Sequence, residues 1–300
     1  MKILITGGNG QLGTELQRIL KDGKAEIGTI PSAYSDAEVV ATDYSILDVT
    51  NREAVLNFVA DSCFDLIINC AAITNVDGCE NDSKTAFLVN GQGPSYLSEA
   101  ADNIGAKIVH ISTDYVYSGL DSRPRIESDE PNPLSVYGSS KLAGERAVLD
   151  GCEKHFVIRT AWLYGYVGKN FVKTMMSLGE KFKEITVVND QFGNPTSAND
   201  LAYGILCIAQ TDNYGIYHCT NEGTCSWFDF ATTIMQKANL DCKVVGCTSE
   251  EYLAKNPASA KRPAYSSLVN KHLEDTIGNK MRPWQDALDT YFENLASQEG

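Results

Sequence analysis

Residues 2–13 read KILITGGNGQLG, and this stretch decides the fold class. Its first five residues form a short apolar run typical of a buried strand, and Gly7, Gly10 and Gly13 follow ahead of a helical pattern. Gly7 permits a tight turn, Gly10 lets the backbone approach a pyrophosphate, and Gly13 allows close packing of helix on strand. The helix N-terminus offers free N–H groups to an anion. The stretch therefore predicts a dinucleotide-binding loop, with a β-α turn that binds no ligand as the alternative.

Predicted strands and helices alternate through the first half of the chain. The predicted strands are 2–6, 38–42, 66–72, 107–112 and 155–160. The predicted helices between them are 11–21, 52–61, 83–103 and 137–149. Because the strands are apolar throughout rather than alternating, we expect both of their faces to be buried. This pattern predicts an α/β fold with a doubly wound, Rossmann-like parallel sheet.

The second half has a looser pattern, with turns rich in Gly, Pro and Asn. Helices are predicted near 170–181, 200–210, 226–238 and 282–296. We expect residues 1–166 to form the dinucleotide-binding domain, joined by a returning segment near 190–220, and residues 167–300 to form mainly a smaller C-terminal substrate-binding lobe. The Pro-rich, acidic stretch 121–133 is the most linker-like part and could act as a lid.

Composition limits the classes of partner. The formal net charge of −14 over 300 residues argues against nucleic acid, which requires a basic surface. The apolar runs are too short to cross a membrane and the N-terminus lacks the features of a signal peptide, so we expect a cytoplasmic protein. A pocket for a small anion needs only one or two local cations, which have to be identified individually.

The cysteines predict no chemistry of their own. Nine is an odd number for a disulfide framework, and no pair has the Cys-x-x-Cys spacing. We expect reduced, mostly buried thiols with packing roles, as for Cys70 and Cys207 within apolar runs.

An acidic residue at the end of the second strand is expected to bind the adenosine ribose. Asp43 closes the run 38–42, and no Arg or Lys follows it directly to hold a 2′-phosphate, which favours NADH over NADPH. Alternatively, 25–30 is the second strand and Asp43 lies elsewhere. Asp48 and Val49 could flank the adenine, although Asp48 could equally be a helix N-cap.

Tyr137 and Lys141 are four residues apart in a helical pattern and so lie on one helix face. A free tyrosine has a pKa of about 10, and a neighbouring ammonium would lower it toward neutral pH. The pair therefore predicts proton transfer by Tyr137, assisted by Lys141. An ordinary amphipathic pair is the alternative for an isolated helix, but the glycine loop favours the catalytic interpretation.

A hydroxyl at the carboxyl end of the fourth predicted strand would complete this site. Thr113 is the preferred candidate and Ser112 the second, since ligands of open α/β sheets bind at that edge. A hydroxyl that only caps the strand end is the alternative. Together the three side chains predict interconversion of an alcohol and a ketone, with the hydride carried by a nicotinamide cofactor.

With these residues placed, the chain resembles the extended short-chain dehydrogenase/reductases, and among them the dTDP-4-dehydrorhamnose reductase family, over nearly its whole length. The matching stretches are GGNGQLG (7–13), NCAA (69–72), STDYVY (112–117), YGSSKLAGE (137–145), TAWLYG (160–165), NFVKTM (170–175), NDQFGNPT (189–196) and RP (262–263). The resemblance implies NAD(P)H-dependent reduction of the 4-keto group of dTDP-4-dehydro-β-L-rhamnose to dTDP-L-rhamnose, an activated sugar for cell-surface polysaccharide.

The resemblance also implies roles for residues. Thr113 and Tyr137 would contact the keto oxygen, and Lys141 would bind the nicotinamide ribose. The residues expected along the cofactor are Gly7, Gly10, Gln11, Leu12, Gly13, Asp43, Asp48, Val49, Ala71, Ala72, Tyr137, Lys141 and Trp162. The residues expected at the substrate are Thr113, Asp114, Tyr137, Asn170 and Arg262. The planar guanidinium of Arg262 suits a pyrophosphate, with a plain surface arginine as the alternative.

Other activities of the same fold remain as alternatives. Related dehydratases place a Glu directly after the Asp, and here Tyr115 follows Asp114, which disfavours dehydration. A reductase or epimerase of another nucleotide sugar, or a non-catalytic cofactor-binding regulatory subunit, stays open. Some relatives are dimers with interfacial magnesium, and Glu15 occupies a comparable place, but a Glu on a helix surface is by default solvated. We predict no metal site and leave monomer and homodimer open.

Overall fold

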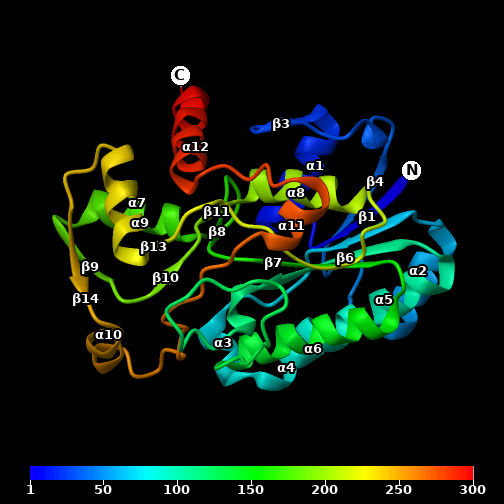
Figure 1. Cartoon of the computed structure of the whole chain (residues 1–300), viewed down its shortest axis with the longest axis horizontal. Helices are drawn as coiled ribbons and strands as arrows, with labels where there is room; N and C mark the ends of the chain where they lie inside the picture. The colour runs from blue at the N-terminus through cyan, green and yellow to red at the C-terminus, as the bar shows by residue number, and fades with distance from the viewer. Residues whose placement is uncertain (300) are drawn as a thin grey trace.

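The computed structural model describes residues 1–299 and places a six-stranded parallel sheet at the centre of the molecule (Figure 1). Its strands are β1 (Lys2–Thr6), β4 (Glu38–Thr42), β5 (Leu66–Asn69), β6 (Lys107–Thr113), β7 (His155–Thr160) and β12 (Gly215–His218). They are arranged in the order β12-β7-β6-β5-β1-β4, and every neighbouring pair is parallel. The predicted doubly wound sheet is confirmed.

Helices cover both faces of this sheet. On one face lie α1 (Gln11–Asp22), α8 (Ala198–Ala209) and α11 (Lys271–Ile277), and on the other α2 (Arg52–Ser62), α5 (Gly93–Ile104) and α6 (Val136–Gly151) (Figure 1). Ile3 and Ile5 of β1 belong to the core under α1 and α8, whereas Leu4 belongs to the core under α2 and α5. Because consecutive residues of one strand are buried on opposite faces, the strand sequence is apolar without alternation.

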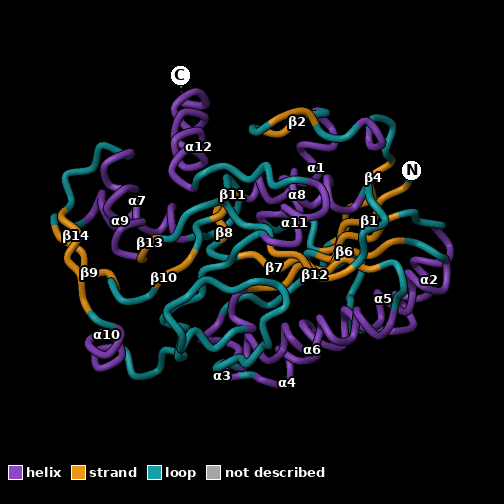
Figure 2. The backbone as a smooth tube through the Cα atoms, in the orientation of Figure 1, coloured by secondary structure: helices purple, strands orange, loops and turns teal. Residues whose placement is uncertain are grey.

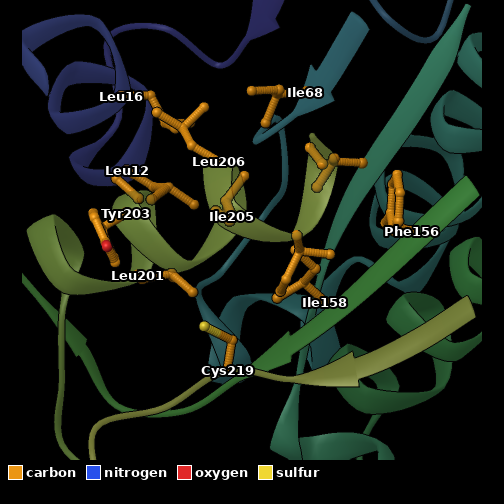
Figure 3. Packing of buried hydrophobic residues seen from close by; sticks show 14 of the residues in the cluster. Leu12, Leu16, Ile68, Phe156, Ile158, Leu201, Tyr203, Ile205, Leu206 and Cys219 are labelled. Atoms are coloured by element: carbon orange, nitrogen blue, oxygen red, sulfur yellow. The ribbon is translucent and has the colours of Figure 1, made fainter. Parts of the chain in front are cut away.

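The helix α8 returns from the second half of the chain to cover the first. In Figure 3, Leu201, Ile205 and Leu206 of α8 lie between Leu12 and Leu16 of α1 and the sheet. The strand β12 then joins the sheet beside β7. Both elements fall within the range 190–220, while the division of the chain at residue 166 stays a prediction.

A second cluster of elements lies at the end of the molecule opposite to the N-terminus (Figure 2). It contains α7 (Phe171–Lys181), α9 (Trp227–Lys237), α10 (Ser249–Lys255) and the parallel pair β9 (Glu184–Val188) and β14 (Lys243–Cys247). Shorter pairs are β8 (Leu163–Tyr164) with β11 (Thr196–Ser197), and β10 (Phe192–Gly193) with β13 (Cys225–Ser226). With α12 (Trp284–Glu299), α7 and α9 enclose a separate apolar core.

The segment 83–103 was predicted to be one continuous helix, and this prediction is wrong. It consists of α4 (Ser83–Phe87), a π-helical turn η2 (Leu88–Gln92) and α5. Within the wide turn, the Asn90 Oδ1 accepts a hydrogen bond from the Ile73 N–H (2.8 Å), and its Nδ2 donates to the Ile73 carbonyl (3.0 Å) and to Ser140 Oγ (3.1 Å). These bonds fix the loop after β5 against α6.

One further alternative is decided by the structure. Residues 25–30 contain most of a small hairpin, β2 (Lys24–Ala25) with β3 (Gly28–Thr29), so the second strand of the sheet is β4, directly before Asp43. The segment 121–133 is joined to the segment 267–269 through backbone hydrogen bonds of Arg125, and none of its residues lines the cleft described below, so the lid stays a prediction.

Several short elements were not predicted. They include α3 (Val76–Asn81), the 3-10 turns η1 (Ser32–Tyr34) and η3 (Asp114–Val116), and the helices α10 and α11. Among residues 1–299, no helix combines the length and apolar composition needed to cross a membrane.

Candidate active site

A cleft of about 410 Å³ opens where the glycine loop follows β1. Its walls are the glycine loop, the residues after β5, the end of β6, the start of α6 and the loop after β7. From β1 the chain crosses to β4 at one edge of the sheet, and from β5 it crosses to β6 on the other side. This divergence between neighbouring strands is where open α/β sheets bind ligands.

The glycine loop has the geometry that its sequence predicts. Gly7 has a φ of +66°, and a Cβ there would lie 2.8 Å from the Ala71 nitrogen. A Cβ on Gly13 would lie 2.4 Å from the Gly7 carbonyl oxygen, so α1 packs against the turn through backbone atoms alone. Gly10 is the N-cap of α1 and has no side chain to cap the first N–H groups. Those groups are therefore available to an anion.

Asp43 is held at the edge of this loop. Its Oδ1 accepts hydrogen bonds from the Ser45 N–H (2.9 Å) and Oγ (2.6 Å), and its Oδ2 accepts one from Asn9 Nδ2 (2.5 Å). These hydrogen bonds, those from Ser45 above all, lower the pKa of the Asp43 carboxyl. Asp43 is therefore a carboxylate at neutral pH, tied to the glycine loop through Asn9.

The remaining predicted cofactor residues divide between the cleft and its surroundings. Asp48 accepts hydrogen bonds from the N–H and Oγ1 of Thr50, and the N-cap of α2 is Asn51, so the interpretation of Asp48 as a helix cap is wrong. Asp43, Asp48, Val49 and Ala71 do not line the cleft. The predicted cofactor residues that do line it are Gly7, Gly10, Gln11, Leu12, Gly13, Ala72, Tyr137, Lys141 and Trp162.

Thr113, Tyr137 and Lys141 meet in the cleft, as predicted. Ser135 caps α6 by accepting a hydrogen bond from the Gly138 N–H (3.1 Å), which places Tyr137 in the first turn. The Tyr137 ring lies edge-on to Tyr115, with 5.8 Å between ring centroids. One turn further along α6, the Lys141 Nζ donates to the Ile111 carbonyl at the end of β6 (2.6 Å).

Burial governs the protonation of this pair. Burial raises the pKa of Tyr137 above its ordinary value, with a smaller lowering by a hydrogen bond to Thr113. Burial also lowers the pKa of Lys141 to about 8, partly offset by Glu145. Burial therefore dominates the pKa of Tyr137 in this structure, and Lys141 is not among the groups that shift it. The ammonium is directed to a backbone carbonyl, and the phenol keeps its proton at neutral pH.

Several polar atoms in the cleft wall have no protein partner. Ser112 Oγ, Thr160 Oγ1 and Asp114 Oδ2 are buried without a hydrogen bond to any described residue. Thr113 Oγ1 donates to Asp114 Oδ1 (2.9 Å), and burial raises the Asp114 pKa to about 6. Because buried polar atoms are nearly always hydrogen-bonded in native proteins, these three would take a partner from an ordered water or a polar ligand.

Trp162 forms part of the wall nearest the second lobe. It has a φ of +47°, and its ring stacks on Trp227 with 3.5 Å between centroids and 7° between planes. A Cβ on Gly193 would lie 2.5 Å from the Trp162 ring, so this glycine leaves room for the indole. The strained backbone of Trp162 is thus held by packing on both sides.

The two predicted phosphate contacts are placed differently. Asn170 lines the cleft, and its Nδ2 donates to Gln11 Oε1 (3.0 Å). Arg262 lies outside, with its guanidinium 3.4 Å from Asp77, beside a separate hollow of about 160 Å³ that Leu134 and Tyr252 help to line. Arg262 thus does not line the cleft, although its charge acts to lower the pKa of Tyr115, whose ring packs on Tyr137.

Residues that the sequence alone did not single out also line the cleft. They include Cys70, Thr74, Thr160 and Lys169. Thr74 follows β5 and Thr160 ends β7, so the rule that ligands bind at the carboxyl ends of parallel strands would have found both. For Lys169, the only signal was its position next to Asn170.

Glu15 is buried rather than solvated. It is 2% exposed, against the expectation of a solvated side chain, and its Oε2 accepts hydrogen bonds from Arg18 Nη2 (2.8 Å) and Asn199 Nδ2 (3.0 Å). Within the described residues, no three His, Cys, Asp or Glu side chains are grouped for a metal.

Comparisons with known proteins agree with this geometry. The sequence matches the family described as RmlD substrate binding domain over residues 1–297. It is 38% identical to the spore coat polysaccharide biosynthesis protein SpsK of Bacillus subtilis (strain 168), over 99% of this chain and 98% of that protein. The structure is similar to a dTDP-4-dehydrorhamnose reductase of Clostridium acetobutylicum ATCC 824, with a TM-score of 0.91 and 47% identity over 99% of this chain and 100% of that one. A dTDP-4-dehydrorhamnose reductase of Bacillus anthracis str. Ames, solved in complex with NADP, gives a TM-score of 0.90 and 38% identity over 98% and 99% of the two chains.

Proposed function

The chain belongs to the RmlD substrate binding domain family, and from this we propose that it is an NAD(P)H-dependent oxidoreductase that reduces the 4-keto group of dTDP-4-dehydro-β-L-rhamnose to dTDP-L-rhamnose. The observation that carries the proposal is the meeting of Thr113, Tyr137 and Lys141 in one cleft with the glycine loop. The glycine loop alone could be a tight turn without a ligand, and Tyr137 with Lys141 alone could be an ordinary helix face. Only their combination indicates an oxidoreductase.

In this proposal, Tyr137 is the general acid. When bound, a nicotinamide would supply a hydride to the carbonyl carbon of the sugar, and the keto oxygen would then need a proton. The buried, protonated phenol of Tyr137 donates that proton from its Oη. Thr113 Oγ1, which donates to Asp114 Oδ1 in the structure, would turn its single hydroxyl proton to the same keto oxygen. Lys141, charged below about pH 8, supplies the positive charge that balances the phenolate left behind.

The cofactor is proposed to lie along the glycine loop, with Asp43 at its adenosine ribose. No cationic side chain contributes to the pKa of Asp43, so a 2′-phosphate would meet a carboxylate without a counter-charge there. This arrangement supports a preference for NADH over NADPH. The similar reductase of Bacillus anthracis was solved in complex with NADP, so both cofactors belong in the test.

Dehydration and epimerisation are less well supported. Dehydration in related enzymes needs a carboxylate next in sequence to Asp114, and Tyr115 occupies that position. Asp114 itself, with Asn170, is proposed to bind the sugar nucleotide. An epimerase would return the hydride and consume no cofactor, and a regulatory subunit would not need Tyr137.

The test is a panel of nucleotide-linked ketosugars, each assayed with NADH and with NADPH by loss of absorbance at the nicotinamide band. We expect turnover of dTDP-4-dehydro-β-L-rhamnose, with the higher kcat/KM for NADH. If the protein reduces only another ketosugar of the panel, that sugar is its substrate and the proposed substrate is wrong. Absence of oxidation with every ketosugar would overturn it.

The biological setting follows from the same proposal. The similarity to a spore coat polysaccharide biosynthesis protein supports a role in supplying an activated sugar for polysaccharide synthesis. All nine cysteines are free thiols, as is typical of a reducing compartment, which supports a cytoplasmic location.

A further inference from the structure

An acidic protein that binds two anionic nucleotides needs local positive charge. The chain has a formal net charge of −14, and both the proposed cofactor and the proposed substrate carry a diphosphate. Among the described residues that line the cleft, two have cationic side chains, Lys141 and Lys169. These two are the cationic side chains of the cleft that could meet a diphosphate.

Lys141 is already engaged. Its side chain is buried in the wall, and its ammonium donates to the Ile111 carbonyl at 2.6 Å. Lys169 is exposed at the mouth of the cleft, and no hydrogen bond or ion pair joins its side chain to another described residue. The nearby Lys173 differs, because its Nζ donates to the Tyr166 carbonyl (2.6 Å). Lys169 thus has a free ammonium where an anionic ligand would lie.

The backbone around Lys169 is fastened to the glycine loop. Asn170 Nδ2 donates to Gln11 Oε1 (3.0 Å) and to the Gly165 carbonyl (2.8 Å). On the other side of Lys169, Gly168 has a φ of +75°, and a Cβ there would lie 3.3 Å from Gln11 Cγ. Both neighbours of Lys169 therefore contact the residue that follows Gly10, at the N-terminus of α1.

We propose that Lys169 binds the diphosphate of a nucleotide ligand, opposite the free N–H groups at the start of α1. The inference rests on the proposed function, since it requires a nucleotide in the cleft. Two ligands share this chemistry: the dinucleotide cofactor and the sugar nucleotide. The contact of both neighbours of Lys169 with Gln11 favours the cofactor.

Direct binding to the full-length protein tests this proposal without turnover. NADH is titrated in the absence of any sugar, with its fluorescence or the heat of binding as the signal, into wild type, Lys169→Met and Lys169→Arg. Lys181→Met, which removes one exposed charge from the end of α7, is the matched control. We expect Lys169→Met to weaken NADH binding roughly 10- to 150-fold, as for loss of one hydrogen bond to a charged group. We expect Lys169→Arg and Lys181→Met to stay within about threefold of wild type.

A second titration distinguishes the two ligands. dTDP is added to each protein saturated with NADH, and its dissociation constant is measured by calorimetry. Weakening confined to the NADH titration assigns Lys169 to the cofactor, and weakening confined to the dTDP titration assigns it to the sugar nucleotide. Unchanged binding of both probes by Lys169→Met overturns the inference. Failure of wild type to bind either NADH or NADPH would instead contradict the proposed function.

Discussion

Tyr137 carries the proton chemistry in this account through a hydroxyl that burial keeps protonated. Reduction of a ketone requires an acid that holds its proton until the hydride arrives, so a raised pKa suits the proposed direction. We predict that Tyr137→Phe lowers kcat by roughly 10²–10⁴-fold, the usual contribution of a general acid, and leaves NADH binding unchanged.

Steady-state kinetics together with an NADH titration measure this prediction. Tyr34→Phe is the matched control, because Tyr34 is buried outside the cleft and its hydroxyl donates to the Leu206 carbonyl (3.0 Å). If the Tyr137→Phe variant has the kcat of the wild type, Tyr137 is not the general acid.

Lys141 sets the alkaline limit of activity. Its pKa, lowered to about 8 by burial, means that the ammonium loses its proton above that pH. We predict that kcat/KM falls about tenfold per pH unit above pH 8, because only the charged form balances the Tyr137 phenolate. The same lysine binds fewer protons in the folded than in the unfolded state between pH 8 and its unperturbed value. Its contribution to the free energy of unfolding therefore rises with pH in that window.

A pH profile of kcat/KM from pH 6 to 10 checks this prediction. A profile that stays level to pH 10 would show that the charge of Lys141 does not limit the reaction.

Sequence reasoning found the reactive side chains but not their protonation. Tyr137 and Lys141 are related by helical spacing, and Thr113 by its place at a strand end, so local pattern was sufficient. Their pKa values depend on burial by elements far away in sequence, which no local pattern contains. The same holds for Asn9, which reaches Asp43 across 34 residues, and for the free ammonium of Lys169.

The turn between β1 and α1 depends on backbone packing that only glycine allows. A Cβ on Gly13 would lie 2.4 Å from the Gly7 oxygen, so any side chain displaces the loop. We predict that Gly13→Ala costs about 2–3 kcal/mol of unfolding free energy through overpacking and abolishes measurable NADH binding.

Chemical denaturation and an NADH titration test this prediction. Gly23→Ala at the other end of α1 is the control, because Gly23 has a φ of +70° but nothing within 4 Å of a Cβ. It should cost about 1 kcal/mol of backbone strain and leave NADH binding intact. Wild-type NADH affinity in Gly13→Ala would show that the cofactor does not use this loop as proposed.

The long buried elements were predictable, and the short exposed ones were not. The inner strands β1 and β5 are buried on both faces, so each gives a largely apolar run. The edge strand β12 has four residues, two of them partly exposed, and was not predicted. The pair β9 and β14 is partly exposed and β2 and β3 have two residues each, which leaves too little pattern to recognise. The break in 83–103 was missed because Asn90 terminates regular α-helix through bonds to Ile73, a tertiary contact.

A buried ionic cluster joins the two halves of the molecule. Arg282, just before α12, donates to both carboxylate oxygens of Asp200 on α8 (2.8 and 2.9 Å) and to Glu26 beside the β2–β3 hairpin (3.1 Å). We predict that Arg282→Met lowers the free energy of unfolding by about 3–5 kcal/mol. The buried Asp200 carboxylate loses its cationic partner, and Glu26 keeps only the more distant cation of Arg18 (3.7 Å).

Urea denaturation measures this loss. The control is Arg52→Met, whose partner Glu99 is partly exposed and whose pair should contribute at most about 1 kcal/mol. A cost for Arg282→Met no greater than for Arg52→Met would show that the cluster does not hold the halves together. The sequence predicted a returning segment near 190–220, but not that charges from three distant segments would meet beneath α12.

The central claim is a hydride transfer from nicotinamide to C4 of a nucleotide-linked ketosugar. The most direct test incubates the protein with dTDP-4-dehydro-β-L-rhamnose and NADH deuterated at one or the other face of nicotinamide C4, and locates deuterium in the product by NMR. The account predicts dTDP-L-rhamnose with deuterium at sugar C4 from one of the two cofactors, in equal amount to the NADH oxidised. A product without deuterium from either cofactor, or an altered sugar formed without net oxidation of NADH, would contradict it.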